Sequence, residues 1–202
     1  WEDFEKKAAA PEVKAFLLCN PHNPVGRVWT EEELKRMHDI CTRNGVLVIS
    51  DEIHGDLLRK EETFHPIAKV VDGKNVVVCG GANKTFNIAG LQASHIVVQQ
   101  PDLRKAIKDE MGLITPTPFV IHAVIAAYSK GEEWLEELRE YIDANIDAAI
   151  AFAHEKMPKV KIWRPEGTYL LWMNFGAYGL SDDELWERCY RKAGVGVEHG
   201  RD

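Results

Sequence analysis

The chain has 202 residues, enough for one large domain or one and a half ordinary ones. Hydrophobic residues make up 45% and charged residues 28%, which is typical of a globular protein. The net charge is −7 and no basic stripe is visible, which argues against a nucleic-acid-binding protein and against a protein that lies on an anionic membrane. No apolar run could span a membrane and no signal-like segment opens the chain, so the cytoplasm is the expected location.

The cysteines indicate the same compartment. None of the four forms a CxxC pair; they are Cys19, Cys41, Cys79 and Cys189. Two of them, Cys19 and Cys79, fall in apolar strand-like runs and are therefore expected to be buried thiols of a reducing compartment.

The first half of the chain alternates apolar runs with helical patterns. Strands are predicted over residues 14–19, 46–50, 75–79 and 93–98. Thr30, followed three residues later by Glu33, predicts a capping box at the start of a helix that ends near Arg43. Because the strand runs are apolar throughout and separated by helices, they predict a parallel or mixed sheet covered on both sides.

The second half is richer in helices. Helices are predicted over residues 101–111, 119–128 and 132–155, strands over 160–163 and 168–175, and a helix from the cap Ser181 to Lys192. The expected fold class is α/β: a three-layer sandwich with a mostly parallel mixed sheet, followed by a smaller α+β piece. We place the domains at 1–145 and 146–202. Neither end of the chain looks like a finished domain boundary.

One lysine stands at a position suited to chemistry. Lys84 follows the apolar run that ends at Cys79, after the glycine pair Gly80 and Gly81 that opens a tight loop. Its neighbours are largely apolar, and partly apolar surroundings favour the neutral amine over the ammonium. A neutral amine is what a Schiff-base lysine needs. Taken alone, the loop is more typical of a solvated lysine, and only the rest of the chain reverses this interpretation.

Polar residues follow two further predicted strands. Asn23 lies after the first strand, and Asp51 and His54 lie after the second. Ligands of doubly wound sheets bind outside the carboxyl ends of the strands, so these side chains and Lys84 would surround one crevice. Each residue has a plainer explanation, as a turn, a helix cap or a structural histidine. Together they form the set that pyridoxal phosphate requires: an imine-forming lysine, a carboxylate for the ring nitrogen and a donor for the ring oxygen.

Longer motifs carry a family resemblance. The chain resembles the fold-type I pyridoxal-phosphate enzymes of the class I/II aminotransferase superfamily, and within it the cystathionine β-lyase-type C–S lyases of the MalY/PatB type. The segments that carry the resemblance are Cys19-Asn20-Pro21-His22-Asn23-Pro24-Val25-Gly26, Ser50-Asp51-Glu52-Ile53-His54 and Asn83-Lys84-Thr85-Phe86-Asn87-Ile88-Ala89-Gly90-Leu91. Two more support the subgroup: Glu132-Glu133-Trp134-Leu135 and Pro165-Glu166-Gly167-Thr168-Tyr169-Leu170-Leu171-Trp172.

The resemblance implies a role for each candidate residue. Lys84 would form the imine with pyridoxal 5'-phosphate and later move the Cα proton of the substrate. Asp51 would pair with the pyridine nitrogen, and Asn23 would hydrogen-bond the ring 3′-oxygen. His54 stands where many relatives carry a tyrosine that faces the same oxygen. Asn83 is a candidate to donate to the cofactor phosphate.

The chain also departs from the family pattern. Many aminotransferases hold the phosphate with a serine and an arginine at the positions of Gly81 and Gln92, so Asn83 and Thr85 are the remaining candidates. The glycine-rich phosphate segment and the carboxylate-binding arginine of the family are absent. Family members are about twice as long, so we expect a fragment of their middle and later part that binds the cofactor weakly or not at all by itself.

Three functions stay open from the sequence. The resemblance favours a lyase that cleaves a cysteine S-conjugate to thiol, pyruvate and ammonia. A class I/II aminotransferase would use the same lysine to move an amino group to a 2-oxo acid. A non-catalytic interaction module that keeps the fold is the third possibility. The family further implies a small amino-acid substrate and a homodimer whose sites lie at the interface.

Overall fold

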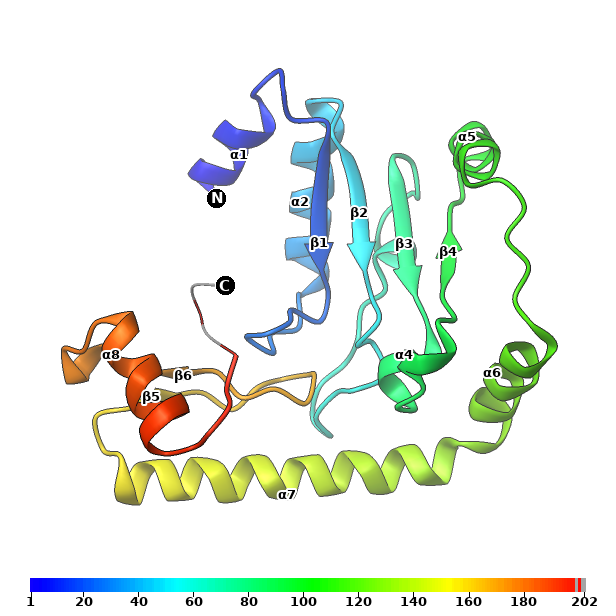
Figure 1. Cartoon of the computed structure of the whole chain (residues 1–202). Helices are drawn as coiled ribbons and strands as arrows, with labels where there is room; N and C mark the ends of the chain where they lie inside the picture. Colours follow the sequence, from blue (N-terminus) through cyan, green and yellow to red (C-terminus); the bar gives the residue numbers. More distant parts are fainter. Residues whose placement is uncertain (199, 201–202) are drawn as a thin grey trace.

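The core of the protein is a four-stranded sheet (Figure 1). In the computed structural model, which describes residues 1–198 and 200, the strand order is β1-β2-β3-β4. The strands are β1 (Ala15–Cys19), β2 (Leu47–Asp51), β3 (Val76–Gly80) and β4 (His95–Val97). The first three run parallel and β4 runs antiparallel to β3. The predicted α/β class with a mostly parallel mixed sheet is therefore confirmed.

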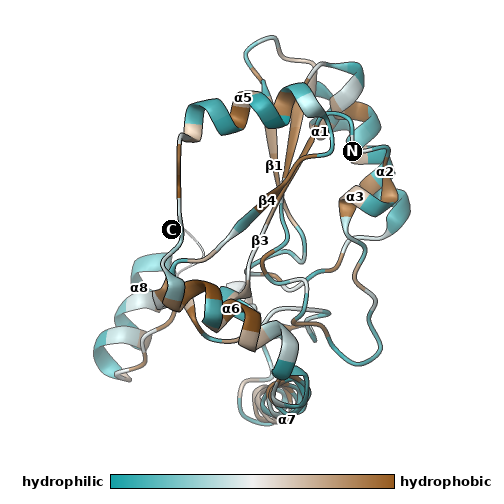
Figure 2. Ribbon diagram, turned by 90° about the vertical axis from the view of Figure 1, so that its right-hand side faces the viewer, coloured by the Kyte–Doolittle hydropathy of each residue, from teal (hydrophilic) through white to brown (hydrophobic). Residues whose placement is uncertain are grey.

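Helices cover one face of this sheet. Three helices lie on that side (Figure 2): α1 (Glu2–Ala8), α2 (Glu31–Arg43) and α3 (Ile67–Val70). The expected capping box is present, since Thr30 accepts from the backbone of Glu33 and Glu33 accepts from the backbone of Thr30. The buried cluster between α2, α3 and the sheet consists of Leu18, Leu34, Met37, Cys41, Val46, Val48, Ile67, Val76 and Val78.

The opposite face departs from the prediction. We expected strands buried on both sides, but Leu17 is 71% exposed and all three residues of β4 are exposed. Side chains alternate between the two faces of a strand, and the described helices pack mainly against the face that carries Leu18 and Val48. An apolar run in the sequence indicates that both faces of a strand are apolar. It does not indicate which segment of the protein covers each face.

The second half wraps around the carboxyl ends of the strands. Five helical segments precede the small sheet: α4 (Ala82–Thr85), η1 (Ala89–Leu91), α5 (Pro101–Met111), α6 (Pro118–Lys130) and α7 (Glu132–Lys156). The small antiparallel sheet pairs β5 (Lys161–Ile162) with β6 (Met173–Asn174). After it come η2 (Gly176–Tyr178), α8 (Asp182–Trp186) and the π-helical η3 (Glu187–Lys192). Figure 1 places α7 beyond the ends to which β1, β2 and β3 point.

Two predicted elements of this half were wrong in extent. The strand expected over 168–175 is reduced to β6, because Thr168 leaves the extended conformation at φ +68° and bonds instead to Leu57. The helix capped by Ser181 is α-helical only to Trp186 and then becomes π-helical. The proposed boundary at 145/146 falls inside the continuous helix α7, and the division into domains 1–145 and 146–202 stays a prediction.

One glycine ties the two halves together. Gly26 has φ +81°, and its carbonyl accepts from the backbone N–H of Glu166 at 2.8 Å and of Gly167 at 2.9 Å. A Cβ at this position would lie 2.4 Å from the Cβ of Pro165. Neither atom belongs to a flexible side-chain end, so the backbone itself would have to move.

We predict that Gly26→Ala lowers the free energy of unfolding by about 1–3 kcal/mol, the usual cost of an overpacked site, plus the strain of a positive φ. Urea unfolding would measure the loss. Gly45→Ala is the matched control, because Gly45 has φ +66° but nothing within 4 Å of its added Cβ. Equal losses in both variants would contradict the proposed clash with Pro165.

Candidate active site

Three parallel strands bring the predicted site residues to one edge of the sheet. Asn23 lies in the loop after β1, Asp51 is the last residue of β2, and Lys84 lies in α4, which follows β3. In register, Asp51 pairs with Cys19 on one side and with Cys79 on the other. The carboxylate therefore stands between two thiols on the sheet face that the described helices leave open.

The charge of Asp51 acts on its neighbours. Burial raises the pKa of the Cys19 thiol, and Asp51 adds to the effect while a backbone hydrogen bond from Asn23 opposes it. Burial raises the pKa of Cys79, again with a contribution from Asp51. One carboxylate oxygen accepts from the backbone N–H of Ile53 at 3.2 Å. Both cysteines are half-buried rather than buried as expected, and all four cysteines are free.

His54 is influenced by the charges of both the carboxylate and the lysine. Its side chain is buried and its Nδ1 has no hydrogen-bond partner among the described residues. Burial lowers the pKa of His54, the charge of Lys84 lowers it further, and Asp51 opposes both. The lowered pKa favours the neutral form of the imidazole. The ring of Tyr169 packs edge-on against it with centroids 5.4 Å apart.

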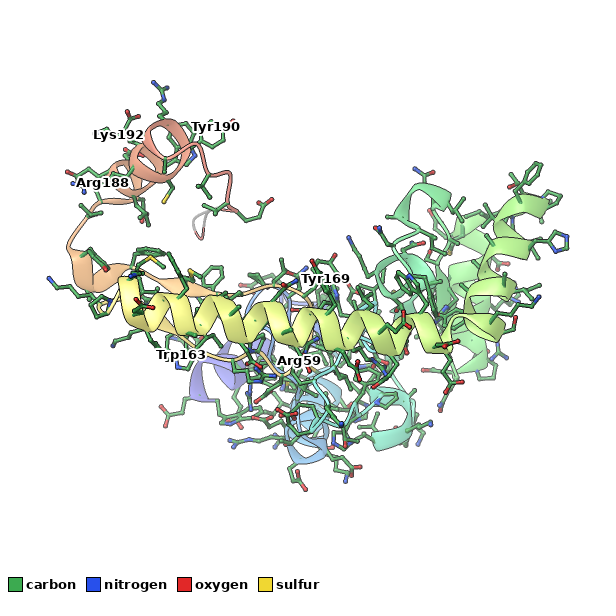
Figure 3. All side chains as sticks on the ribbon, turned by 90° about the horizontal axis from the view of Figure 1, so that it is seen from below. Arg59, Trp163, Tyr169, Arg188, Tyr190 and Lys192 are labelled. Carbon is green, nitrogen blue, oxygen red and sulfur yellow. The ribbon has the colours of Figure 1, made fainter. Side chains whose placement is uncertain are left out.

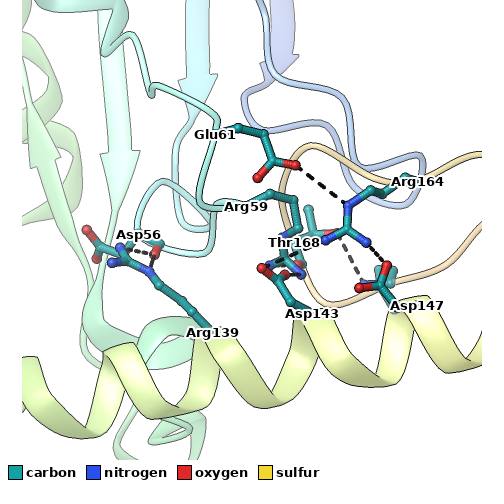
Figure 4. Close-up of polar contacts among 9 residues, drawn as sticks. Asp56, Arg59, Glu61, Arg139, Asp143, Asp147, Arg164 and Thr168 are labelled. Carbon is teal, nitrogen blue, oxygen red and sulfur yellow. Dashed lines mark hydrogen bonds and ion pairs between the residues drawn. The ribbon is translucent and has the colours of Figure 1, made fainter.

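The lysine segment is a short helix rather than the loop we expected. Lys84 is half-buried in α4, and its neighbour Thr85 is fully buried. The hydroxyl of Thr85 donates to Asp56 Oδ2 at 2.9 Å, while the carbonyl of Asp56 accepts from Arg139 Nε of α7 at 2.9 Å. Figure 4 shows the Arg139–Asp56 contact. This chain of bonds ties α4 to the loop after β2 and to α7.

We predict that Thr85→Val lowers the free energy of unfolding by about 1–3 kcal/mol, because Asp56 Oδ2 loses its donor in a half-buried position. Valine keeps the shape of threonine, so the loss reports the hydroxyl alone. Guanidinium unfolding would measure it, with Ser129→Ala as the control, since the Ser129 hydroxyl bonds to Ile125 on an exposed surface. An unchanged midpoint for Thr85→Val would show that Asp56 finds another partner.

The remaining predicted residues lie around this centre. The side chain of Asn23 is exposed, and its backbone N–H donates to Cys19 Sγ at 3.3 Å. Both Asn–Pro bonds of this loop are cis. The side-chain oxygen of Asn83 is buried without a hydrogen-bond partner among the described residues. Gly81 cannot be a serine here, since a Cβ would lie 2.8 Å from the carbonyl oxygen of Ala93.

Comparison with known proteins places this arrangement in a family. The model of the family described as aminotransferase class I and II matches residues 1–202. The chain belongs to this family. Two curated proteins are similar to it. Cystathionine β-lyase PatB of Bacillus subtilis (strain 168) is 45% identical over 99% of this chain and 53% of the relative. Protein MalY of Escherichia coli (strain K12) is 34% identical over 98% of this chain and 51% of the relative.

Solved structures of the aminotransferase class I and II fold agree. The PLP-bound C–S lyase of Staphylococcus hominis matches with a TM-score of 0.93 at 36% identity, over 99% of this chain and 53% of that one. Cystalysin of Treponema denticola, which contains a pyridoxal 5'-phosphate cofactor, matches with a TM-score of 0.92 at 30% identity, over 98% of this chain and 51% of that one. The chain spans about half the length of these relatives. Within the described residues, no helix is long and apolar enough to cross a membrane.

Two residues near the site have no motif of their own. Arg59 stands in a charged stretch that is typical of a solvated surface, yet it is fully buried beneath α7. Tyr169 lies in the segment that supports the subgroup, but no spacing connects it with His54. The spacings of Tyr169 from Gly167 and of Arg59 from His54 are too common in sequences to mark a functional residue. Only the fold shows that these two side chains lie near the site.

Proposed function

We propose that the protein containing this chain is a pyridoxal-phosphate-dependent C–S β-lyase that cleaves a cysteine S-conjugate to thiol, pyruvate and ammonia. The observation that carries the proposal is that Asp51 at the end of β2 and Lys84 in α4 after β3 lie at the carboxyl edge of the sheet, where the charges of both act on the buried His54. Support comes from relatives that are named cystathionine β-lyase and C–S lyase.

The residues at this edge fit the cofactor. Two buried polar atoms have no hydrogen-bond partner among the described residues, Nδ1 of His54 and the side-chain oxygen of Asn83, and they leave hydrogen-bonding capacity for a bound molecule. Lys84 would hold the cofactor covalently, Asp51 would hold the proton of its ring nitrogen, and Asn23 would donate to its ring oxygen. Asn83 would lie by the phosphate. When bound, pyridoxal phosphate supplies a conjugated ring that accepts electrons from the substrate Cα.

The chain's own groups then account for the proton movements. The amine of Lys84, once released, would take the Cα proton as general base. The carboxylate of Asp51 would keep a positive charge on the ring nitrogen throughout. Burial lowers the pKa of His54 and so favours its neutral form, which would accept or donate one hydrogen bond without adding a positive charge to the site. The thiolate would leave from Cβ of the substrate.

An aminotransferase is the second candidate. It is supported by the family itself and by relatives such as the aspartate aminotransferase of Geobacillus stearothermophilus, 29% identical over 84% of this chain. It would use Lys84 and Asp51 in the same way but return the proton to the cofactor instead of expelling a thiolate. A non-catalytic module would keep the fold without the linkage to Lys84. We further propose domains 1–145 and 146–202 and a homodimer for the full-length protein.

We predict that a protein of the relatives' full length that contains this chain releases pyruvate from cystathionine without an added 2-oxo acid. Lactate dehydrogenase coupling would measure the release. Conversion of an added 2-oxo acid to its amino acid, with no release of pyruvate or thiol from cystathionine, would favour the aminotransferase. In a pyridoxal phosphate titration, we expect the 202-residue chain to develop little of the visible absorbance band of a lysine-linked cofactor. Tight binding by the short chain would contradict this expectation.

A further inference from the structure

A buried arginine joins three segments below the candidate site. Arg59, in the loop after β2, is 2% exposed. Its Nη2 donates to the carbonyl of Thr168 at 2.9 Å, and its Nη1 lies 2.8 Å from Asp143 Oδ1 of α7. The latter contact is an ion pair without hydrogen-bond geometry, and Arg59 Nε has no partner among the described residues. Figure 4 shows the guanidinium between the C-terminal segment and the helix.

The residue that Arg59 holds has an uncommon backbone conformation. Thr168 has φ +68°, a region that a β-branched residue rarely adopts and that persists only where the surroundings impose it. Its N–H donates to the Leu57 carbonyl at 2.7 Å, and its hydroxyl accepts from Leu170 at 3.2 Å. The bond from Arg59 to the Thr168 carbonyl completes this fixation at the peptide unit that leads directly into Tyr169.

Tyr169 connects the fixed Thr168 backbone with the candidate site. Its ring packs against His54, and it is the residue next to Thr168. In the view from below in Figure 3, Arg59 and Tyr169 are both seen at the level of the middle of α7, whose Asp143 pairs with Arg59. Because the bonded carbonyl belongs to the Thr168–Tyr169 peptide, a shift of that peptide would move the Tyr169 backbone and with it the ring.

We propose that Arg59 is a positioning residue for the candidate active site: its bond to the Thr168 carbonyl holds the ring of Tyr169 against His54. The proposal rests on the proposed function for its catalytic meaning, but its geometry does not require a cofactor. As a consequence, the pKa of His54 depends on Arg59, which acts on it only through Thr168 and Tyr169.

The titration of His54 measures this dependence. Among the described residues, Asp51 of β2 and Lys84 of α4 act on the imidazole through their charges, and Tyr169 of the C-terminal segment packs against it. Burial is the largest reason why the pKa of His54 is lowered, and the ring of Tyr169 is one of the groups packed against the imidazole. A displaced tyrosine ring would admit water, stabilise the imidazolium and raise the pKa of His54 toward its ordinary value.

The experiment is an NMR titration of His54 in the 202-residue chain without cofactor, with the resonance assigned by its loss in His54→Gln. We expect Arg59→Met and Tyr169→Leu each to raise the pKa of His54, and the double variant to raise it no further than Tyr169→Leu alone. Arg59→Lys keeps the positive charge but not the planar fork that spans Thr168 and Asp143, so it should also raise the pKa, by less. If Arg59→Met does not fold, Arg59→Lys carries the test.

Arg164→Met is the matched control. Arg164 also approaches Asp143, at 3.9 Å, but makes no bond to Thr168. Arg164→Met therefore measures the long-range effect of removing a positive charge near Asp143. We expect it to leave the pKa of His54 unchanged. The proposal is overturned if both Arg59 variants leave the titration unaltered, or if Arg164→Met shifts it equally. A purely structural role would lower the unfolding midpoint of Arg59→Met and leave the His54 titration in place. Absence of cofactor binding, by contrast, would count only against the proposed function.

Discussion

Lys84→Ala should abolish the visible absorbance band of lysine-linked pyridoxal phosphate and reduce pyruvate release by about a thousandfold or more. The variant removes both the amine that would hold the cofactor and the base that would take the Cα proton, and a positioned base alone contributes about 10²–10⁴-fold. Borohydride reduction of the full-length protein with cofactor, followed by peptide mass mapping, would locate the linkage on Lys84.

Lys14→Ala is the control for this variant. Lys14 lies just before β1, at the amino end of the strands and away from the candidate site. It should keep both the absorbance band and the activity. A band that persists in Lys84→Ala, or a label on another lysine, would contradict the assignment of Lys84. Absence of a band in the unsubstituted full-length protein would contradict the proposed enzyme itself.

Local sequence patterns predicted the first half of the fold well. The strands β1, β2 and β3 begin and end within one residue of the predicted ranges, because each is a short apolar run bounded by turn residues. The capping box at Thr30 and Glu33 is present for the same reason, since both partners lie within one turn of helix. Parallel strands then bring the loops that follow them to one edge, which is why the sequence alone predicts that Asn23, Asp51 and Lys84 belong to one group.

Contacts between distant segments could not be predicted in this way. Thr168 belongs to an alternating run that indicates a strand, yet its bonds to Leu57 and Arg59 hold it at a positive φ. Local preference yields here to partners more than 100 residues away along the chain. The burial of Arg59 has the same origin, because the pairing with Asp143 on α7 and the bond to the Thr168 carbonyl together compensate the buried guanidinium.

The open face of the sheet shows a related limit. The apolar residues Leu17 and Ile49 predict burial, but Leu17 is largely exposed in this chain. Asp51 belongs to the same face as these residues, since it lies two positions after Ile49 in β2. The alternation therefore indicates which side chains share a face with the candidate site, whereas the covering of that face depends on segments that the pattern does not specify.

Asp51→Asn should leave the absorbance band of lysine-linked cofactor in place but lower pyruvate release by about a hundredfold or more. An asparagine cannot hold a proton on the ring nitrogen by opposite charge, and removing one such electrostatic contact at a reacting centre costs about 10²–10³-fold in rate. The neighbouring groups provide a second measurement that needs no cofactor. The charge of Asp51 raises the pKa of His54 and of the Cys19 and Cys79 thiols, so its loss should lower all three.

Glu52→Gln is the matched control for Asp51→Asn. Glu52 is the next residue along the chain, and its Oε1 accepts from the N–H of Ile67 at 2.9 Å and from the hydroxyl of Ser50 at 3.0 Å. Glutamine retains that oxygen, so the variant removes one charge beside Asp51 without breaking these bonds, and it should keep most of the activity. Thiol alkylation at pH 8 should become faster in Asp51→Asn, because a lower pKa increases the thiolate fraction. Equal activity losses in the two variants would contradict a specific role of Asp51. They would indicate that the loss of any negative charge at the end of β2 lowers the activity.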